Sequence, residues 1–165
     1  MLEAIENSAF ATFVRESPSL FGYTAVLALH AIGLAIVAGV NTVVALRLLG
    51  VARDIPLWPI RKLFPLMYTG FWINALSGVA LLAANASGML TNAMFYIKMV
   101  FIVIAVVIMR SMHNTVFADL LPDTDVHHAT LGRRLAAASL VCWLGAIVAG
   151  RLIAYPYFVA AWFGI

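Results

Sequence analysis

Four polar side chains lie inside long apolar stretches of this chain, and they are the residues best suited to chemistry: His30, Asn74, Lys98 and Arg151. Polar groups inside a bilayer are costly and are therefore candidates for function. An imidazole can bind a metal or accept a proton, and a guanidinium can pair with an anion. The sequence thus indicates one metal ligand, His30, within a cofactor-binding set of these four residues.

His30 raises the question of a haem. Membrane b-type haems are usually held between two imidazoles at one depth, but the other histidines lie near or beyond the opposite membrane face: His113, His127 and His128. A haem b on His30 would need a methionine, a tyrosine, a partner chain or an empty sixth position. The alternatives are a neutral core histidine held by hydrogen bonds and a role in handling protons or quinone.

Arg151 requires compensation for its charge. A guanidinium stays ionised, and every acidic residue lies outside the apolar stretches, at positions 3, 6, 16, 54, 119, 123 and 125. We expect a cofactor or lipid anion as its partner, then Glu16 or Glu6, then a partner chain. The alternative is that Arg151, like the shallower Lys98, extends to the headgroups. For Asn74 the alternative is interhelical hydrogen bonding.

The composition assigns the chain to the integral membrane proteins. Its 165 residues are 64% hydrophobic and 10% charged, with a mean hydropathy of +1.02, whereas soluble domains carry about 25% charged residues. Four apolar segments are long enough to cross a bilayer: about 20–49, 63–87, 93–117 and 135–158. Short connections predict one all-α membrane domain over 1–165, an antiparallel bundle of four transmembrane helices.

Residues 1–18 are too polar to span a bilayer, and they lack the basic start of a signal peptide. Apolar residues alternate there with charged ones, which predicts an N-terminal amphipathic helix lying in the interface. Ser17 and Pro18 are suited to be the N-cap and first residue of the first span.

The basic residues predict the orientation. Seven of them flank the first-to-second and third-to-fourth connections: Arg47, Arg53, Arg61, Lys62, Arg110, Arg133 and Arg134. The positive-inside rule places these connections in the cytoplasm and both termini in the periplasm. We expect a multi-pass protein of the bacterial inner membrane. The basic residues form no continuous face, so we expect no nucleic acid partner.

Small and polar residues share one face on each of the first two spans. The first stripe contains His30, Gly33, Val37 and Asn41, and the second contains Gly70, Asn74, Ser77, Gly78 and Asn85. Such stripes allow membrane helices to pack closely and to form hydrogen bonds with each other. We therefore predict that these two faces meet.

Several short motifs resemble a known family: Leu29–Gly33, Leu46–Gly50, Phe64-Pro65, Ser77–Leu82, Phe95–Lys98 and Gly150–Tyr155. With these motifs the chain resembles a family of small uncharacterised bacterial four-helix inner-membrane proteins, a domain of unknown function. The layout of that family is similar to membrane b-type cytochromes and copper-resistance D proteins. The family usually has an acidic residue shortly before the first histidine, where this chain has Val26 to Leu29.

These observations lead to one functional expectation and its rivals. We expect a membrane subunit associated with redox chemistry, at most an electron-transfer subunit, that binds haem b or a quinone in the outer half of the bilayer. The alternative is a non-catalytic accessory or scaffold subunit, contacting other membrane subunits or a second copy. A small transporter is disfavoured because the spans contain no carboxylate. No hydrolytic or nucleotide-binding motif is present.

A second group of polar residues follows the third span: Asp123, Asp125, His127 and His128. Their spacing does not match standard zinc sites, and the two aspartates are suited to cap the fourth span. The roles of these histidines and of His113 stay open.

Overall fold

The computed structural model of the chain describes residues 6–17, 21–51, 54–116 and 126–155, and within these ranges it contains helices and turns but no strand. The elements are α2 (Ala9–Glu16), α3 (Tyr23–Leu49), α4 (Leu57–Arg61), α5 (Phe64–Ala84), α6 (Ala86–Leu90), α7 (Ala93–Ser111), the π-helical turn η1 (Met112–Val116) and α8 (Val126–Leu152). In this part of the chain four helical stretches are long and apolar enough to cross a membrane: Tyr23–Leu49, Trp58–Ala84, Ala93–Asn114 and Thr130–Leu152. The predicted all-α, four-helix membrane fold is confirmed.

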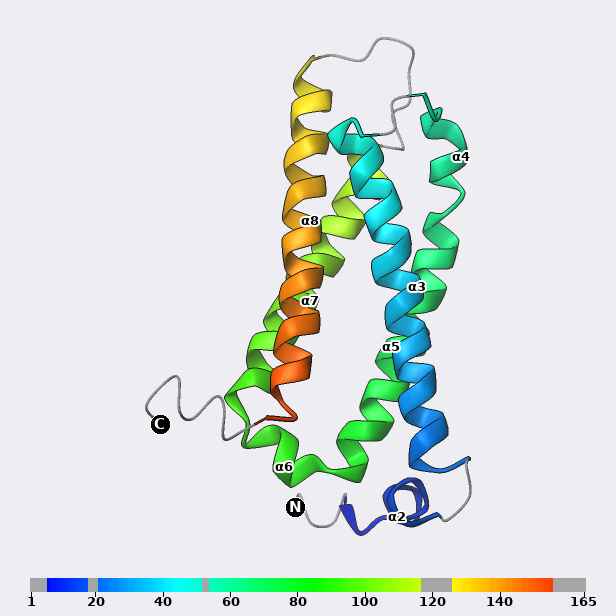
Figure 1. Cartoon of the computed structure of the whole chain (residues 1–165), viewed down its shortest axis with the longest axis vertical. Helices are drawn as coiled ribbons and strands as arrows, with labels where there is room; N and C mark the ends of the chain where they lie inside the picture. Colours follow the sequence, from blue (N-terminus) through cyan, green and yellow to red (C-terminus); the bar gives the residue numbers. More distant parts are fainter. Residues whose placement is uncertain (1–5, 18–20, 52–53, 117–125, 156–165) are drawn as a thin grey trace.

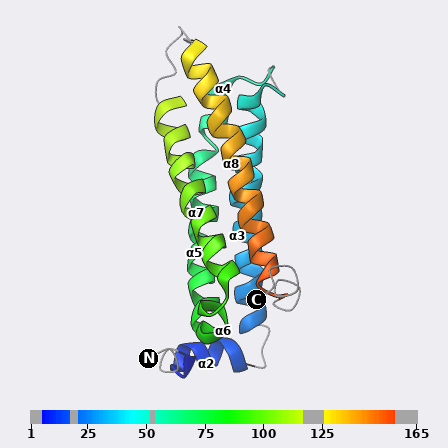
Figure 2. The same ribbon diagram turned by 90° about the vertical axis from the view of Figure 1, so that its left-hand side faces the viewer.

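The long helices form an elongated antiparallel bundle of two pairs (Figures 1 and 2). α3 packs along α5, α7 packs along α8, and contacts between α3 and α8 join the pairs. α2 lies across one end of the bundle, where α6 also connects α5 to α7. We call this end the α2 end.

Glycines allow α3 and α5 to approach closely. A methyl group at Gly33 would lie 2.5 Å from the backbone N of Asn74 and 2.9 Å from the backbone O of Gly70. A methyl group at Gly70 would lie 2.9 Å from the backbone N of Val37. Most members of the two predicted stripes are buried in this contact: Gly33, Val37, Asn41, Gly70, Asn74 and Ser77. The prediction that these faces meet is confirmed.

The main hydrophobic core extends from the middle of the bundle to the end away from α2. All four long helices contribute large buried side chains, among them Val44, Phe64, Met67, Met109 and Trp143. In the same half, the Asn41 amide donates a hydrogen bond of 3.3 Å to the Ser139 hydroxyl and so connects α3 to α8. The packing is therefore uneven, because the half near α2 opens into a cavity instead.

α2 is the predicted amphipathic helix, described over a shorter range than 1–18. The hydroxyl of Ser8 caps it by accepting a hydrogen bond from the backbone N of Ala11. Ala11 and Val14 are buried against the bundle, whereas Phe10 and Phe13 are more than half exposed. Exposed aromatic side chains at the end of an apolar bundle suit an interfacial position.

The predicted start of the first span is wrong. Ser17 is the C-cap of α2, and Gly22 precedes α3 as its N-cap. A methyl group at Gly22 would lie 2.8 Å from the Cβ of Ser17, so Gly22 packs closely on the end of α2, where a larger residue would clash. Pro18 lies outside the described residues.

Two other predicted boundaries also differ. The described helix of the fourth span is Val126–Leu152 rather than 135–158. The second long helix ends at Ala84, one residue before Asn85, whose φ of −148° departs from the helix. Residues 86 and 87, which were predicted to belong to the second span, lie in the separate helix α6.

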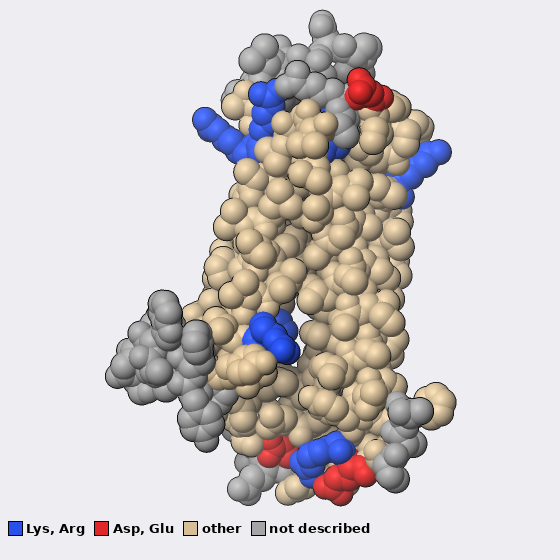
Figure 3. Space-filling model, viewed as in Figure 1, with Lys and Arg blue, Asp and Glu red and all other residues tan. Residues whose placement is uncertain are grey.

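The charged residues are divided between the two ends of the bundle (Figure 3). Lys and Arg side chains gather at the end away from α2, together with Asp54, while the α2 end carries Glu6, Glu16 and Arg15. Apart from the Lys and Arg side chains at the hollow in the lower half, the face shown between the ends carries no charged residue. Many large hydrophobic side chains of the long helices are exposed, as contact with lipid tails requires. The basic residues thus lie at the end that holds the first-to-second and third-to-fourth connections, which the positive-inside rule assigns to the cytoplasm.

Candidate functional site

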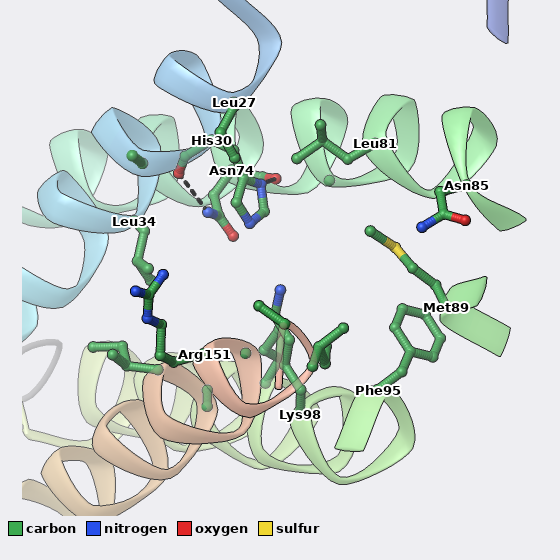
Figure 4. Close-up of a pocket in the computed structure, with 18 of the residues that line it drawn as sticks. Leu27, His30, Leu34, Asn74, Leu81, Asn85, Met89, Phe95, Lys98 and Arg151 are labelled. Carbon is green, nitrogen blue, oxygen red and sulfur yellow. Dashed lines mark hydrogen bonds between the residues drawn. The ribbon is translucent and has the colours of Figure 1, made fainter. Parts of the chain in front are cut away.

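A cavity of about 730 Å³ separates the two helix pairs in the half near α2. Figure 3 shows it as a hollow between the pairs, with Lys or Arg side chains at its rim. All four predicted site residues line it: His30 from α3, Asn74 from α5, Lys98 from α7 and Arg151 from α8. The structure therefore brings together residues that are far apart in the sequence (Figure 4).

The His30 ring is held by α5. Its Nδ1 lies 2.9 Å from the backbone O of Asn74 and 3.2 Å from the Ser77 hydroxyl oxygen. A carbonyl oxygen can only accept a hydrogen bond, so Nδ1 must carry the proton. The Ser77 hydroxyl donates to the backbone O of Ile73 and is free to accept from the ring. The lone pair of a neutral imidazole then resides on Nε2.

A second hydrogen bond closes the contact between His30 and Asn74. The Asn74 amide donates to the backbone O of His30 over 2.8 Å. Gly78 provides space for the ring, because a methyl group there would lie 3.1 Å from the Cε1 atom of His30. Asn74 thus has the interhelical bonding role that was its predicted alternative, and it also orients the imidazole.

Lys98 lies against α8 on the opposite wall of the cavity. Its Cδ and Cε atoms would lie 3.5 Å from a methyl group at Gly150, and its Nζ 3.8 Å from it. The absence of a side chain at Gly150 gives the lysine stem room to lie along α8. The side chain is half-buried, and it extends from α7 into the cavity toward the α3–α5 wall (Figure 4).

Arg151 has a neutral partner. Its Nη2 donates a hydrogen bond of 3.0 Å to the Tyr155 hydroxyl, and its guanidinium carbon lies 5.2 Å from the centre of the Tyr155 ring. The guanidinium reaches into the cavity toward Leu34 of α3 (Figure 4). This tyrosine hydroxyl is none of the partners expected for Arg151, although it lies one helical turn further along. The expectation of a cofactor or lipid anion stays a prediction.

The two carboxylates expected near Arg151 are engaged elsewhere. Glu6 accepts hydrogen bonds of 2.7 Å from both the backbone N and the hydroxyl of Ser87. These bonds hold the pKa of the Glu6 carboxyl below its ordinary value of 4.5. Glu16 forms an ion pair of 3.0 Å with Arg15. Within the described residues, neither cation of the cavity has a carboxylate partner.

The cavity also contains residues that the sequence reasoning missed. Met89 of α6 and Phe95 of α7 extend into it (Figure 4), and Tyr23 and Trp143 line it. Trp143 is 3% exposed, and no acceptor in the described part of the chain lies within hydrogen-bond distance of its Nε1. Met89 lies beyond the end of the predicted second span. Nothing in the sequence pattern therefore indicated that it would lie near His30.

His113 does not line this cavity. His113 lies in η1, and its ring packs 4.8 Å from Phe64 and 6.2 Å from Tyr68, centre to centre. The side chains of His127 and His128, with Asp123 and Asp125, lie outside the described residues. Among the residues that the structure does describe, no group of three His, Cys, Asp or Glu side chains could hold a metal ion.

The arrangement combines three chemical capacities in an apolar surrounding. A fixed neutral imidazole presents one nitrogen lone pair that can bind a metal or accept a proton. Two cations from the opposite wall can pair with anions or donate to carbonyl oxygens. Apolar side chains complete the lining, including Leu27, Leu34, Leu81 and Ile102. Comparisons with protein-family models, with curated proteins and with solved structures found no match to this chain.

Proposed function

We propose that the chain is a membrane subunit associated with redox chemistry, and that it binds haem b or a quinone in this cavity. The orientation of His30 supports the proposal most directly. Its Nδ1–H donates to the Asn74 carbonyl, which is how metal-binding histidines are usually fixed with the other nitrogen as ligand. With the basic end in the cytoplasm, the cavity lies in the outer half of the bilayer.

The residues fit a haem with one histidine ligand. His30 would bind the iron through Nε2, and Met89 is the thioether in the cavity that could occupy the sixth position. Lys98 and Arg151 would pair with the two propionates. The haem would supply one-electron chemistry.

The residues also fit a quinone. Lys98 or Arg151 would donate a hydrogen bond to a quinone carbonyl, and Nε2 of His30 would accept a proton from a quinol hydroxyl. The apolar lining would hold the isoprenoid chain, which can enter from the hydrocarbon region. The volume of about 730 Å³ is typical of small-molecule sites.

The test is an absorption spectrum of the purified protein together with extraction of its bound quinones. We expect a Soret band or a co-purifying quinone, and its loss in His30→Ala. His113→Ala is the matched control, because this histidine lies outside the cavity; it should retain the cofactor. If neither cofactor is found and other subunits co-purify stably, the alternative applies: an accessory or scaffold subunit.

A further inference from the structure

The cavity is lined by two cationic side chains and, among the described residues, by no acidic one. The redox proposal does not require this excess of positive charge. Lys98 and Arg151 both line it, and within the described residues neither has a carboxylate partner. Lys98 is half-buried, and Arg151 is exposed at the edge of the cavity, where the surrounding medium would be lipid. A charged group next to hydrocarbon is disfavoured unless an opposite charge accompanies it. The Tyr155 hydroxyl is a neutral acceptor, so it satisfies hydrogen bonding at Arg151 without neutralising the charge.

The surroundings of these cations determine what kind of anion fits. The cavity is hollowed between the helix pairs and opens on the flank of the bundle, between its two charged ends (Figure 3). Leu27 and Ile147, which line it, are exposed hydrophobic side chains. α2 and α6 lie across the nearby end (Figure 1), and the Glu6–Ser87 hydrogen bonds join the residues just before α2 to α6. A small hydrated anion would have to lose its water to enter from the hydrocarbon region. A molecule with an acidic head and an apolar chain can enter there directly.

We infer that this cavity binds an anionic amphiphile taken sideways from the bilayer, with its acidic head on Lys98 and Arg151 and its apolar part along Leu27, Leu34, Leu81 and Ile102. The acidic head is a phosphodiester or a carboxylate, since both accept charge-assisted hydrogen bonds. An acidic phospholipid, a fatty acid and haem b carry such groups, whereas a quinone does not. The inference stands on the cations and the opening, and it does not depend on the redox proposal.

Trp143 allows the binding to be measured. It lines the cavity, and replacing the other three tryptophans by phenylalanine leaves it as the only indole: Trp58→Phe, Trp72→Phe and Trp162→Phe. The full chain in a non-ionic detergent is titrated with three brominated probes, which quench indole fluorescence on contact. These are brominated phosphatidylglycerol, brominated phosphatidylcholine and dibromostearate.

We expect the acidic probes to quench Trp143 at about tenfold lower concentration than phosphatidylcholine, equivalent to about 1.4 kcal/mol. Quenching by phosphatidylglycerol alone identifies a phospholipid head as the ligand, and quenching by dibromostearate alone identifies a carboxylate. Lys98→Gln and Arg151→Gln should each remove most of this preference. Lys62→Gln, the loss of an exposed cation that lies against Trp58 in the natural sequence, is the matched control and should retain it.

Equal quenching by acidic and zwitterionic probes, or a preference unchanged by both cavity substitutions, would overturn the inference. Mass spectrometry of lipids retained by the natural protein gives a second readout that needs no substitution; an absence of enrichment in acidic amphiphiles would contradict it. His30→Ala separates the two proposals. It should abolish haem or quinone binding while leaving the preference for acidic probes intact, so that each proposal can fail alone.

Discussion

Replacing Gly33 by alanine should separate α3 from α5 and destabilise the protein. The added methyl would lie 2.5 Å from the backbone N and 2.9 Å from the Cα of Asn74, and 2.9 Å from the backbone O of Gly70. These atoms belong to a helix backbone and cannot move aside as a side-chain tip can. The helices must therefore shift as units, at a cost of about 1–3 kcal/mol for an overpacked interface.

Gly39 is the matched control on the same helix. A methyl group there would meet nothing within 4 Å, so Gly39→Ala adds only the gain in helix propensity, about 1 kcal/mol. Gly33→Ala receives the same gain but also the overpacking cost. We expect the two variants to differ in free energy of unfolding by about 1–3 kcal/mol, with Gly33→Ala the less stable.

The assay is thermal unfolding of both variants and the natural protein in one detergent. For a chain of this size the expected difference corresponds to a gap of several degrees in Tm, at about 2–4 °C for each kcal/mol. Ligand binding gives a second readout, because moving α5 away from α3 lengthens the hydrogen bond between the Asn74 amide and the His30 carbonyl. Equal stability of the two variants would refute the close contact at Gly33.

Three further predictions concern topology, pH and charge. Alkaline phosphatase fused to the C-terminus should be active and a fusion after Pro59 inactive; the reverse pattern would invert the orientation. Because the pKa of Glu6 is lowered in the folded protein, its hydrogen bonds to Ser87 should persist above about pH 4.5 and be lost as the pH falls through the lowered pKa. Hydrogen exchange of the α2 amides should then become faster. Glu6→Gln should remove this pH dependence. Arg151→Leu should lose the bound anionic ligand while all four helices still insert, since removing a charge favours insertion; failure of the variant to insert would contradict this.

Composition and the spacing of small residues were sufficient to predict the bundle. Apolar segments of about 20 residues have few folded alternatives in a bilayer, and the glycine-containing stripes identified the contact between α3 and α5. The ends of the helices were harder to predict from the sequence. Ser17 and Pro18 match a helix start locally, but the close packing of Gly22 on Ser17 decides where the turn into α3 occurs.

His30, Asn74, Lys98 and Arg151 were grouped because they are polar residues inside apolar spans, and all four line one cavity. Their partners did not follow from this, because depth in a span says nothing about the rotation of one helix relative to another. The bond from His30 Nδ1 to the Asn74 carbonyl involves backbone that every residue possesses, so no sequence pattern marks it. Tyr155 is the partner that could have been predicted from the sequence, because it follows Arg151 at the spacing of neighbours on a helix.

The uneven packing of the bundle has a consequence for its motion. Two well-packed helix pairs meet through a dense core at one end and through the Asn41–Ser139 hydrogen bond, while the cavity keeps them apart at the other. At the cavity end the pairs are joined by α6, which connects α5 to α7. A molecule bound in the cavity would contact both pairs there, through His30 and Asn74 on one wall and Lys98 and Arg151 on the other. A tightly held ligand should therefore slow hydrogen exchange in α6 and in the adjacent turns of α3, α5, α7 and α8 while leaving the core end unchanged.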